Sequence, residues 1–249
     1  MRFKDRVAIV TGGTSGIGLA VARIFNREDA KVVLVGRDAD RGKSVLDEFR
    51  PEDVIFVQGD VGNAKDCERC VGVTRERFGR IDILFNNAGS IYVNRTVADT
   101  TEEEWDETLN SNLKGAYLMS KFVIPHMAGG SIVNNASIFG LVGGMGVAAY
   151  CAAKGGLINL TRAMALDHAA QNIRINCVCP GSVDTPLLEK EMEDLGGVEI
   201  QLPKFASRHP MNRVATPEEV ANAVAFLASD EASFITGAAL SVDGGRAAW

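Results

Sequence analysis

The sequence predicts an α/β fold with a single doubly wound parallel sheet that carries helices on both faces. Short apolar runs alternate with segments of helical period along the chain, which is typical of βαβ units. Several of these runs are β-branched and apolar on both faces, as expected of parallel strands covered on both sides. The 249 residues contain no linker, low-complexity tract or internal repeat, so we expect one domain over residues 1–249.

The predicted elements follow one another in a regular order. Seven apolar runs are the expected strands: Val7–Val10, Val32–Val35, Val54–Val57, Ile83–Phe85, Ile132–Val133, Ile173–Val178 and Ala239–Val242. Four segments with a helical pattern lie between them: Ile17–Phe25, Trp105–Met127, Tyr150–Ala169 and Pro217–Ala228. The last helix has a strong start signal, because Thr216 can cap it, Pro217 suits the first helical position and acidic residues follow.

One segment, Pro186 to Met211, carries no strong strand pattern. Leu187, Leu188, Met192 and Leu195 could form the apolar face of a short helix within it. An insertion of this size after the carboxyl end of a strand is typical of loops that cover a site. We therefore interpret residues 186–211 as a substrate lid; the alternative is a surface excursion without a role.

The five cysteines indicate thiols rather than disulfides, because their number is odd and no signal peptide precedes them. Cys67 and Cys70 form a C-x-x-C, but neither a neighbouring histidine nor a second cysteine pair completes a zinc set. We expect both to be small hydrophobic residues on one helix, with no metal. Cys177 and Cys179 alternate along a predicted strand and should share a buried face.

Charge and hydropathy argue against two classes of partner. The net charge of −6 and the lack of a basic stretch disfavour nucleic acid. The first ten residues contain no apolar region of signal-peptide length. The uncharged run from Met127 to Ala153 is broken by six glycines and is too polar for a membrane helix. We therefore expect a cytoplasmic protein without a membrane partner.

A glycine-rich turn, Thr11 to Gly18, follows the first predicted strand and precedes a helix. Glycines at such a turn let backbone N–H groups approach a pyrophosphate at the positive end of the helix. The spacing is G-x-x-x-G-x-G rather than G-x-G-x-x-G. Such turns also serve as plain connections, but this position in a βαβ unit favours dinucleotide binding.

Tyr150 and Lys154 form a second candidate constellation. Four residues apart in a helical segment, they share one face of the helix. A nearby ammonium and an oxidised nicotinamide both favour a phenolate, so the phenol could exchange a proton with a carbonyl or alcohol oxygen near neutral pH. Ser137, at the end of the fifth strand, could hold that oxygen by a hydrogen bond. Two unrelated surface residues are the alternative.

Across essentially its whole length, the chain resembles the short-chain dehydrogenases/reductases of about 250 residues. Thr11–Gly18 is similar to the T-G-x-x-x-G-x-G of that family, Asn86–Gly89 to its N-N-A-G and Tyr150–Lys154 to its Y-x-x-x-K. Ser137 and Asn112 fall on two further catalytic positions. One departure is Ala136, where many relatives have a second serine.

The resemblance implies a Rossmann fold and a role for each matched residue. Tyr150 would be the acid/base, Ser137 would orient the substrate oxygen, and Lys154 would bind the nicotinamide ribose and lower the pKa of Tyr150. Asn112 would hold a water in a proton relay with Lys154. The implied cofactor-binding residues are Gly12, Thr14, Ser15, Gly16, Ile17, Gly18, Arg37, Asp60, Val61, Asn87, Ala88, Gly89, Tyr150, Lys154, Pro180, Gly181, Val183 and Thr185.

The choice between NADP(H) and NAD(H) should be read just after the second strand. Relatives that use NAD typically carry an aspartate where this chain has Gly36, and the following Arg37 could pair with a 2′-phosphate. Ser15 replaces a second basic residue common in NADP-preferring relatives, and Asp38 and Asp40 weaken the local positive field. We favour NADP(H), with NAD(H) as the alternative.

The expected function is hydride transfer between a nicotinamide cofactor and a ketone or secondary alcohol. A 3-oxoacyl thioester reductase of fatty-acid synthesis is the alternative within this class. A dehalogenase-like lyase or a non-catalytic binding module would lose residues that are present here. The expected pocket wall is mostly apolar and favours an uncharged or weakly polar substrate: Phe139, Leu141, Val142, Met145, Leu187, Leu188 and Met192. The resemblance also implies a homotetramer, with Trp105–Met127 and Tyr150–Ala169 in one interface and the final strand in another.

Overall fold

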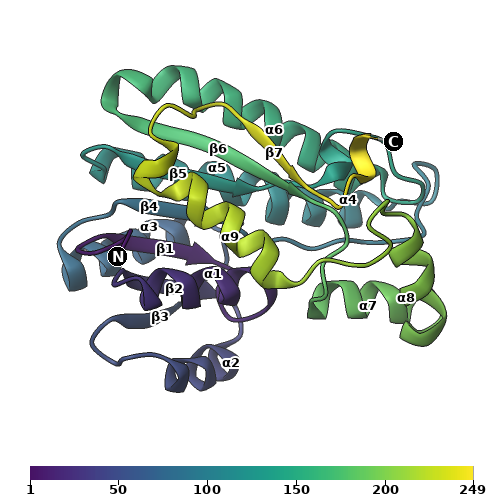
Figure 1. Ribbon diagram of the computed structural model, residues 1–249, viewed down its shortest axis with the longest axis horizontal. Helices are drawn as coiled ribbons and strands as arrows, with labels where there is room; N and C mark the ends of the chain where they lie inside the picture. Colours follow the sequence, from purple (N-terminus) through teal and green to yellow (C-terminus); the bar gives the residue numbers. More distant parts are fainter. Residues whose placement is uncertain (249) are drawn as a thin grey trace.

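The computed structural model describes residues 1–248 and contains a seven-stranded sheet in which every neighbouring pair of strands is parallel (Figure 1). The strand order is β3-β2-β1-β4-β5-β6-β7. The strands are β1 Val7–Thr11, β2 Lys31–Gly36, β3 Val54–Gln58, β4 Ile83–Asn86, β5 Gly130–Asn135, β6 Ile173–Pro180 and β7 Ala239–Val242. The predicted fold class is confirmed, and the order reverses between β1 and β4, where such sheets bind ligands.

Helices cover both faces of the sheet (Figure 1). One face carries α1 Gly16–Arg27, α2 Ala39–Ser44 and α9 Pro217–Ala228. The other face carries α3 Ala64–Phe78, α4 Glu102–Leu109, α5 Gly115–Val123 and α6 Ala148–His168. Two further helices, α7 Pro186–Asp194 and α8 Val198–Ser207, pack against one another beyond β6.

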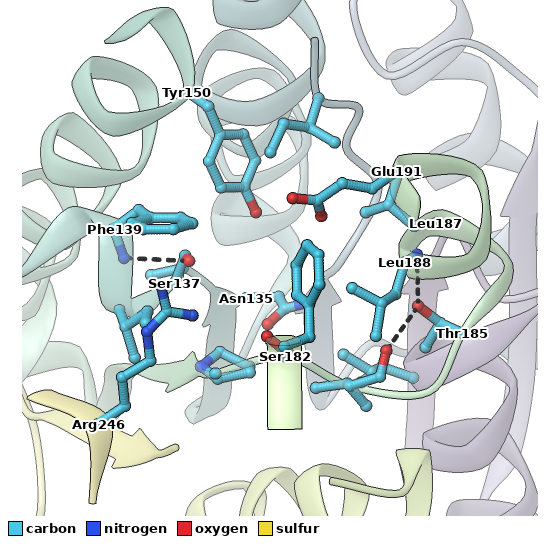
Figure 2. A pocket seen from close by; sticks show the side chains of 18 residues that line it. Asn135, Ser137, Phe139, Tyr150, Ser182, Thr185, Leu187, Leu188, Glu191 and Arg246 are labelled. Carbon is cyan, nitrogen blue, oxygen red and sulfur yellow. Dashed lines mark hydrogen bonds between the residues drawn. The ribbon is translucent and has the colours of Figure 1, made fainter. Parts of the chain in front are cut away.

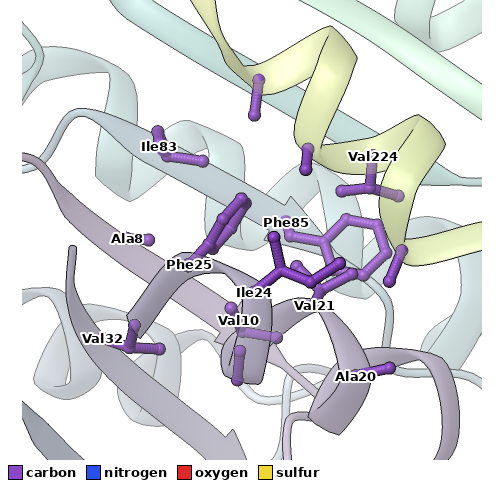
Figure 3. Packing of buried hydrophobic residues seen from close by; sticks show 14 of the residues in the cluster. Ala8, Val10, Ala20, Val21, Ile24, Phe25, Val32, Ile83, Phe85 and Val224 are labelled. Atoms are coloured by element: carbon purple, nitrogen blue, oxygen red, sulfur yellow. The ribbon is translucent and has the colours of Figure 1, made fainter. Parts of the chain in front are cut away.

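Alternation along the strands explains why both faces of the sheet are apolar. Ala8 and Val10 of β1 point into the cluster under α1 and α9, whereas Ile9 points into the opposite cluster under α3 and α5. Figure 3 shows Phe25 of α1 and Phe85 of β4 in the first cluster, where both are completely buried. Burying an aromatic side chain of this size contributes about 1.5–3 kcal/mol, so these two rings help to hold α1 on the sheet.

The predicted helical segment Trp105–Met127 is helical from Glu102 to His126, but it is not an α-helix throughout. The chain forms α4, then a π-helical turn over Asn110–Lys114, then α5 and a 3-10 turn over Ile124–His126. Pro125 lies in the 3-10 turn, where it cannot donate the N–H that a longer α5 would need. The π-helical turn contains Asn112, and such turns are frequent at functional sites.

The predicted start of α9 is confirmed. The Thr216 side chain accepts a hydrogen bond from the backbone N–H of Glu219, and the Glu219 side chain accepts one from the N–H of Thr216. Cys67 and Cys70 lie buried on α3, and Cys177 and Cys179 lie buried on β6, as expected. Within residues 1–248, no helix is long and apolar enough to cross a membrane.

Candidate active site and cofactor cleft

The predicted motifs meet at the carboxyl ends of the strands, because parallel strands present these ends along one edge. A cleft of about 600 Å³ is lined by the glycine turn after β1, the segment after β4, and residues of α6 and α7. Its lining includes Gly12, Ser15, Gly16, Ile17, Asn87, Ala88, Gly89, Asn112, Asn135, Tyr150, Lys154 and Thr185. The sequence motifs are separated by up to about 170 residues, so the tertiary structure is what brings them together.

The glycine turn is shaped to leave room for a ligand. Gly16 has a φ of +51°, and a Cβ there would come within 3.0 Å of Thr185 Cγ2, across the cleft. Gly18 lies in α1, where a Cβ would stand 2.2 Å from the carbonyl oxygen of Gly12. Side chains at these positions would fill the cleft or separate the turn from the helix. The turn therefore fits a pyrophosphate at the N-terminus of α1.

A chain of asparagine side chains links β1, β4 and β5 behind this cleft. The Asn87 side chain donates to the carbonyl oxygens of Thr11 at 3.1 Å and Gly12 at 3.2 Å. The Asn135 side chain donates in turn to Asn87 Oδ1 at 2.9 Å. These bonds fix the glycine turn to the ends of β4 and β5. The sequence prediction missed Asn135, although an asparagine pair in an otherwise apolar strand was a readable signal.

Lys154 projects from α6 into the cleft and is almost completely buried. Its Nζ donates to the carbonyl oxygen of Asn135 at 2.7 Å and lies 5.4 Å from the ring centroid of Tyr150. Burial lowers the pKa of Lys154 to about 8, because a charged amine is poorly solvated there. At neutral pH the group is therefore still an ammonium, but it gives up its proton more readily than a lysine in water.

Asn112 faces the same cleft from the π-helical turn. Its side-chain amide donates to the carbonyl oxygens of Ser90 at 2.8 Å and Thr108 at 2.9 Å. The other side-chain atom, Oδ1, is buried and has no hydrogen-bond partner within the described chain. A Cβ at Gly89 would lie 2.4 Å from this oxygen and 3.7 Å from Lys154 Nζ. An acceptor is thus held next to the lysine, where a ligand or water can donate to it.

Tyr150 and Ser137 face each other across an adjoining pocket of about 650 Å³, which Figure 2 shows. Ser137 follows β5, and its Oγ accepts a hydrogen bond from the N–H of Phe139 at 3.2 Å. Burial raises the pKa of Tyr150 well above its ordinary value; the Ser137 hydroxyl opposes this shift and the Glu191 carboxylate adds to it. The lowering of the Tyr150 pKa expected from Lys154 is not found in this structure, where burial dominates.

The remaining predicted cofactor residues divide into three groups. Pro180, Gly181 and Val183 line the pocket of Tyr150 and Ser137, and Arg37 and Asp60 line a separate hollow beyond β2 and β3. Three residues do not line the cleft: Thr14, Gly18 and Val61 are buried in the packing around it.

The expected apolar wall of the substrate pocket is partly wrong. Phe139, Leu187 and Leu188 line it, but Leu141, Val142 and Met145 are exposed outside it, and Met192 packs against Phe205 instead. The 3-10 turn Ile138–Gly140 directs the following residues to the surface. Two charged side chains that the sequence prediction missed, Glu191 and Arg246, line the pocket in their place.

Comparisons with known proteins identify this arrangement as that of a nicotinamide-dependent oxidoreductase. A family model described as enoyl-(acyl carrier protein) reductase matches residues 12–247. The structure also superimposes on the crystal structure of levodione reductase with a TM-score of 0.95, at 36% identity and over 99% of both chains. The chain belongs to the short-chain dehydrogenase/reductase family.

Two curated relatives define the class of reaction. A meso-2,3-butanediol dehydrogenase from Serratia marcescens is 42% identical, over 100% of this chain and 97% of the relative. An NADP-dependent (R)-specific alcohol dehydrogenase from Lentilactobacillus kefiri is 41% identical, over 99% and 98%. The protein is an NAD(P)-dependent oxidoreductase that acts on CH–OH or C=O groups.

Proposed function

We propose that the chain interconverts a ketone and a secondary alcohol, with Tyr150 as the acid/base. The observation that carries this proposal is that Tyr150 lines both the cofactor cleft and the adjoining pocket. A carbonyl oxygen between Ser137 and Tyr150 can accept hydrogen bonds from both hydroxyl groups. Hydride transfer is the chemistry that the nicotinamide supplies when bound.

Side chains of the protein carry out the proton transfer. Tyr150 donates its phenolic proton to the carbonyl oxygen in reduction and accepts it back in alcohol oxidation. Lys154 lies on the cofactor side of Tyr150, where its ammonium and a positively charged nicotinamide favour the phenolate. We assign Asn112 Oδ1 the role of holding a water beside Lys154, because this acceptor is buried, unpartnered and directed at Gly89.

We propose NADP(H) as the preferred cofactor. Gly36 ends β2, so no carboxylate stands at the position where one would repel a 2′-phosphate. Arg37 is exposed and lines the hollow beyond β2. The neighbouring Asp38 is already engaged, since its Oδ1 accepts the N–H of Arg41 at 3.0 Å and its Oδ2 lies 3.7 Å from Arg41 Nε. The relative from Lentilactobacillus kefiri, which is NADP-dependent by name, supports this preference.

We also propose that residues 186–211 form the substrate lid and that the enzyme is a cytoplasmic homotetramer. Leu187, Leu188, Glu191 and Phe205 of α7 and α8 line the pocket, which supports the lid. Leu166 of α6 is 82% exposed, and this apolar side chain supports a subunit interface on that helix. Light scattering after size-exclusion chromatography tests the tetramer, and a monomer at micromolar concentration would contradict it.

An activity screen tests the proposed reaction directly. Purified protein is mixed with NADPH or NADH and with ketones, a polyol-derived ketone and a 3-oxoacyl thioester. We expect loss of the reduced-nicotinamide absorbance with at least one ketone, faster with NADPH. Consumption with the thioester alone would favour the acyl-reductase alternative. No consumption with any carbonyl compound, by protein that still binds cofactor, would contradict the proposal.

A further inference from the structure

Two charged side chains without a part in the proposed proton transfer, Glu191 and Arg246, line the substrate pocket. Figure 2 places them on opposite sides of the pocket, with Tyr150 and Ser137 between them. Glu191 comes from α7, and Arg246 begins the 3-10 turn Arg246–Ala248. Both are half-buried, and they form no ion pair with each other.

A fixed turn aims Arg246 at the pocket. The buried carboxylate of Asp243 accepts the N–H groups of Gly245 at 3.1 Å and Ala247 at 2.7 Å, on either side of Arg246. Gly244 and Gly245 have φ values of +58° and +87°, which other residues adopt at a cost. These two hydrogen bonds occupy the Asp243 carboxylate and fix the backbone of the turn. The Arg246 side chain is therefore held in one direction.

The guanidinium of Arg246 has hydrogen-bonding capacity left for a ligand. It lies over the ring of Phe139, 5.0 Å from the centroid, and none of the ion pairs within residues 1–248 includes it. A guanidinium has five N–H donors in a planar fork, which matches the two oxygens of a carboxylate. A partly buried cation of this kind is more stable when an anion neutralises it.

Opposite charges stand on the two sides of the pocket. Arg208 of the lid lies over Phe205, which lines the pocket, at 4.4 Å from the ring centroid. The guanidinium of Arg246 is on one side and the carboxylate of Glu191 is on the other, while the Asp243 carboxylate next to Arg246 accepts the N–H groups of Gly245 and Ala247. Since Glu191 stands across the pocket from Arg246, it would repel an anion on its own side. A substrate with one negative charge is therefore directed toward Arg246.

We propose that the substrate carries a carboxylate besides its reacting carbonyl or hydroxyl group, and that Arg246 binds this carboxylate. The proposal rests on the proposed function, because it places the reacting oxygen between Ser137 and Tyr150. Arg246 and Glu191 then fix the orientation of the substrate: its charged end points to the chain terminus and its uncharged end to α7. This arrangement differs from the mostly apolar pocket wall expected from the sequence.

The test compares oxo acids with their methyl esters, which keep the ketone and lose the charge. The series is 3-oxobutanoate, 4-oxopentanoate and 5-oxohexanoate, because the spacing between the two groups is part of the question. For the best member, kcat/KM of the acid should exceed that of its ester by about tenfold to a hundredfold, the range of charge-assisted hydrogen bonds. Arg246→Gln should abolish this preference, and Arg246→Lys should restore part of it.

Arg208→Gln is the matched control, since it removes the same charge from an exposed side chain that lies over the buried ring of Phe205. Exposed charges are screened by solvent, so the acid-to-ester ratio should change by less than about threefold. If the acid-to-ester ratio fell equally in the Arg208 and Arg246 variants, the proposal would be overturned. Equal falls would indicate that the preference comes from the positive charge of the two arginines and not from binding of the carboxylate by Arg246. Wild-type ratios near one or below across the series would overturn it as well.

A binding measurement separates this proposal from the proposed function. Calorimetry with enzyme and NADP⁺ compares cyclohexanecarboxylate with cyclohexanecarboxamide, neither of which can react. We expect the carboxylate to bind about tenfold more tightly, and Arg246→Gln to remove the difference. If the enzyme reduced neutral ketones but bound the carboxylate no more tightly than the carboxamide, the carboxylate site at Arg246 would be overturned and the proposed reaction would stand. Selective carboxylate binding without any turnover would instead overturn the proposed reaction.

Discussion

The ammonium of Lys154 donates a hydrogen bond to the backbone carbonyl of Asn135, with an N–O distance of 2.7 Å. This bond joins α6 to the carboxyl end of β5, two residues before Ser137. The Asn135 side chain continues the connection to Asn87 and the glycine turn. One hydrogen-bond network therefore sets the relative positions of the proposed acid/base, the substrate-binding hydroxyl and the cofactor cleft.

The phenol of Tyr150 should be indispensable for turnover. We predict that Tyr150→Phe lowers kcat by about 10²–10⁴-fold, the usual contribution of a general acid or base. Cofactor affinity should stay close to that of the wild type, because the ring that faces the cleft is retained. Steady-state kinetics and fluorescence titration with NADPH measure the two effects. A variant that keeps more than half of the wild-type rate would contradict the role of Tyr150.

His209 should couple the lid to the pocket floor. Its buried ring accepts the N–H of Ser182 at Nε2, 3.1 Å away, and its Nδ1 lies 2.9 Å from the carbonyl oxygen of Phe205. Both bonds require the neutral ring with its proton on Nδ1, which agrees with the effect of burial in lowering the pKa of His209. We predict that His209→Ala increases hydrogen exchange throughout α7 and α8.

Ligand binding should have the opposite effect on this segment. With NADP⁺ and a substrate analogue bound, residues 186–211 of the wild type should exchange more slowly, as expected of a lid. The surface helix α3 serves as an internal reference within the same experiment. Equal exchange of residues 186–211 with and without ligands would rule out the lid.

The elements that the sequence predicted well are those whose signals are local. The strands are recognisable because β-branched residues alternate between two buried faces, as Ile9 and Val10 do in β1. The bounds of α9 are recognisable because Thr216 and Pro217 act within one helical turn. Helix α8 escaped prediction, because its interior Pro203 is a typical helix breaker.

The parts of the site that escaped prediction depend on distant contacts. The π-helical turn at Asn112 is fixed in part by a hydrogen bond to the carbonyl of Ser90, 22 residues away. Glu191 and Arg246 approach the pocket from the lid and from the end of the chain, and neither belongs to a motif. A resemblance to a family indicates its shared catalytic residues, but the residues that select a substrate differ between relatives and require the tertiary structure.

Cofactor preference should depend on the residues at the end of β2. We predict that Arg37→Ala weakens NADP binding by roughly one to two orders of magnitude and changes NAD binding little, because only the 2′-phosphate pairs with the guanidinium. Gly36→Asp should shift the preference further toward NAD, through repulsion of the phosphate and an acceptor for the 2′-hydroxyl. The measurement is the ratio of kcat/KM for the two cofactors in all three proteins. A wild type that prefers NAD by about tenfold would show that Arg37 is not a phosphate ligand.

The buried ammonium of Lys154 should leave a signature in the dependence of stability on pH. Burial lowers its pKa from 10.5 to about 8, so between these values the unfolded chain binds more protons than the folded chain. The stability of the wild type, compared with Lys154→Met, should therefore rise with pH across this window and fall as the pH is lowered toward 8. One pKa unit corresponds to about 1.4 kcal/mol, so the relative gain between pH 7.5 and 9.5 should be on the order of 2 kcal/mol.

Urea unfolding at several pH values measures this gain. Lys190→Met is the matched control, because the Lys190 side chain is 71% exposed and pairs with Asp194 at the surface. The difference between the wild type and this control should stay nearly constant over the same pH range. If the difference in the free energy of unfolding between the wild type and Lys154→Met were also constant, Lys154 would titrate as it does in water. The ammonium would then be solvated in the folded protein, and its bond to Asn135 would not hold it in a buried cleft.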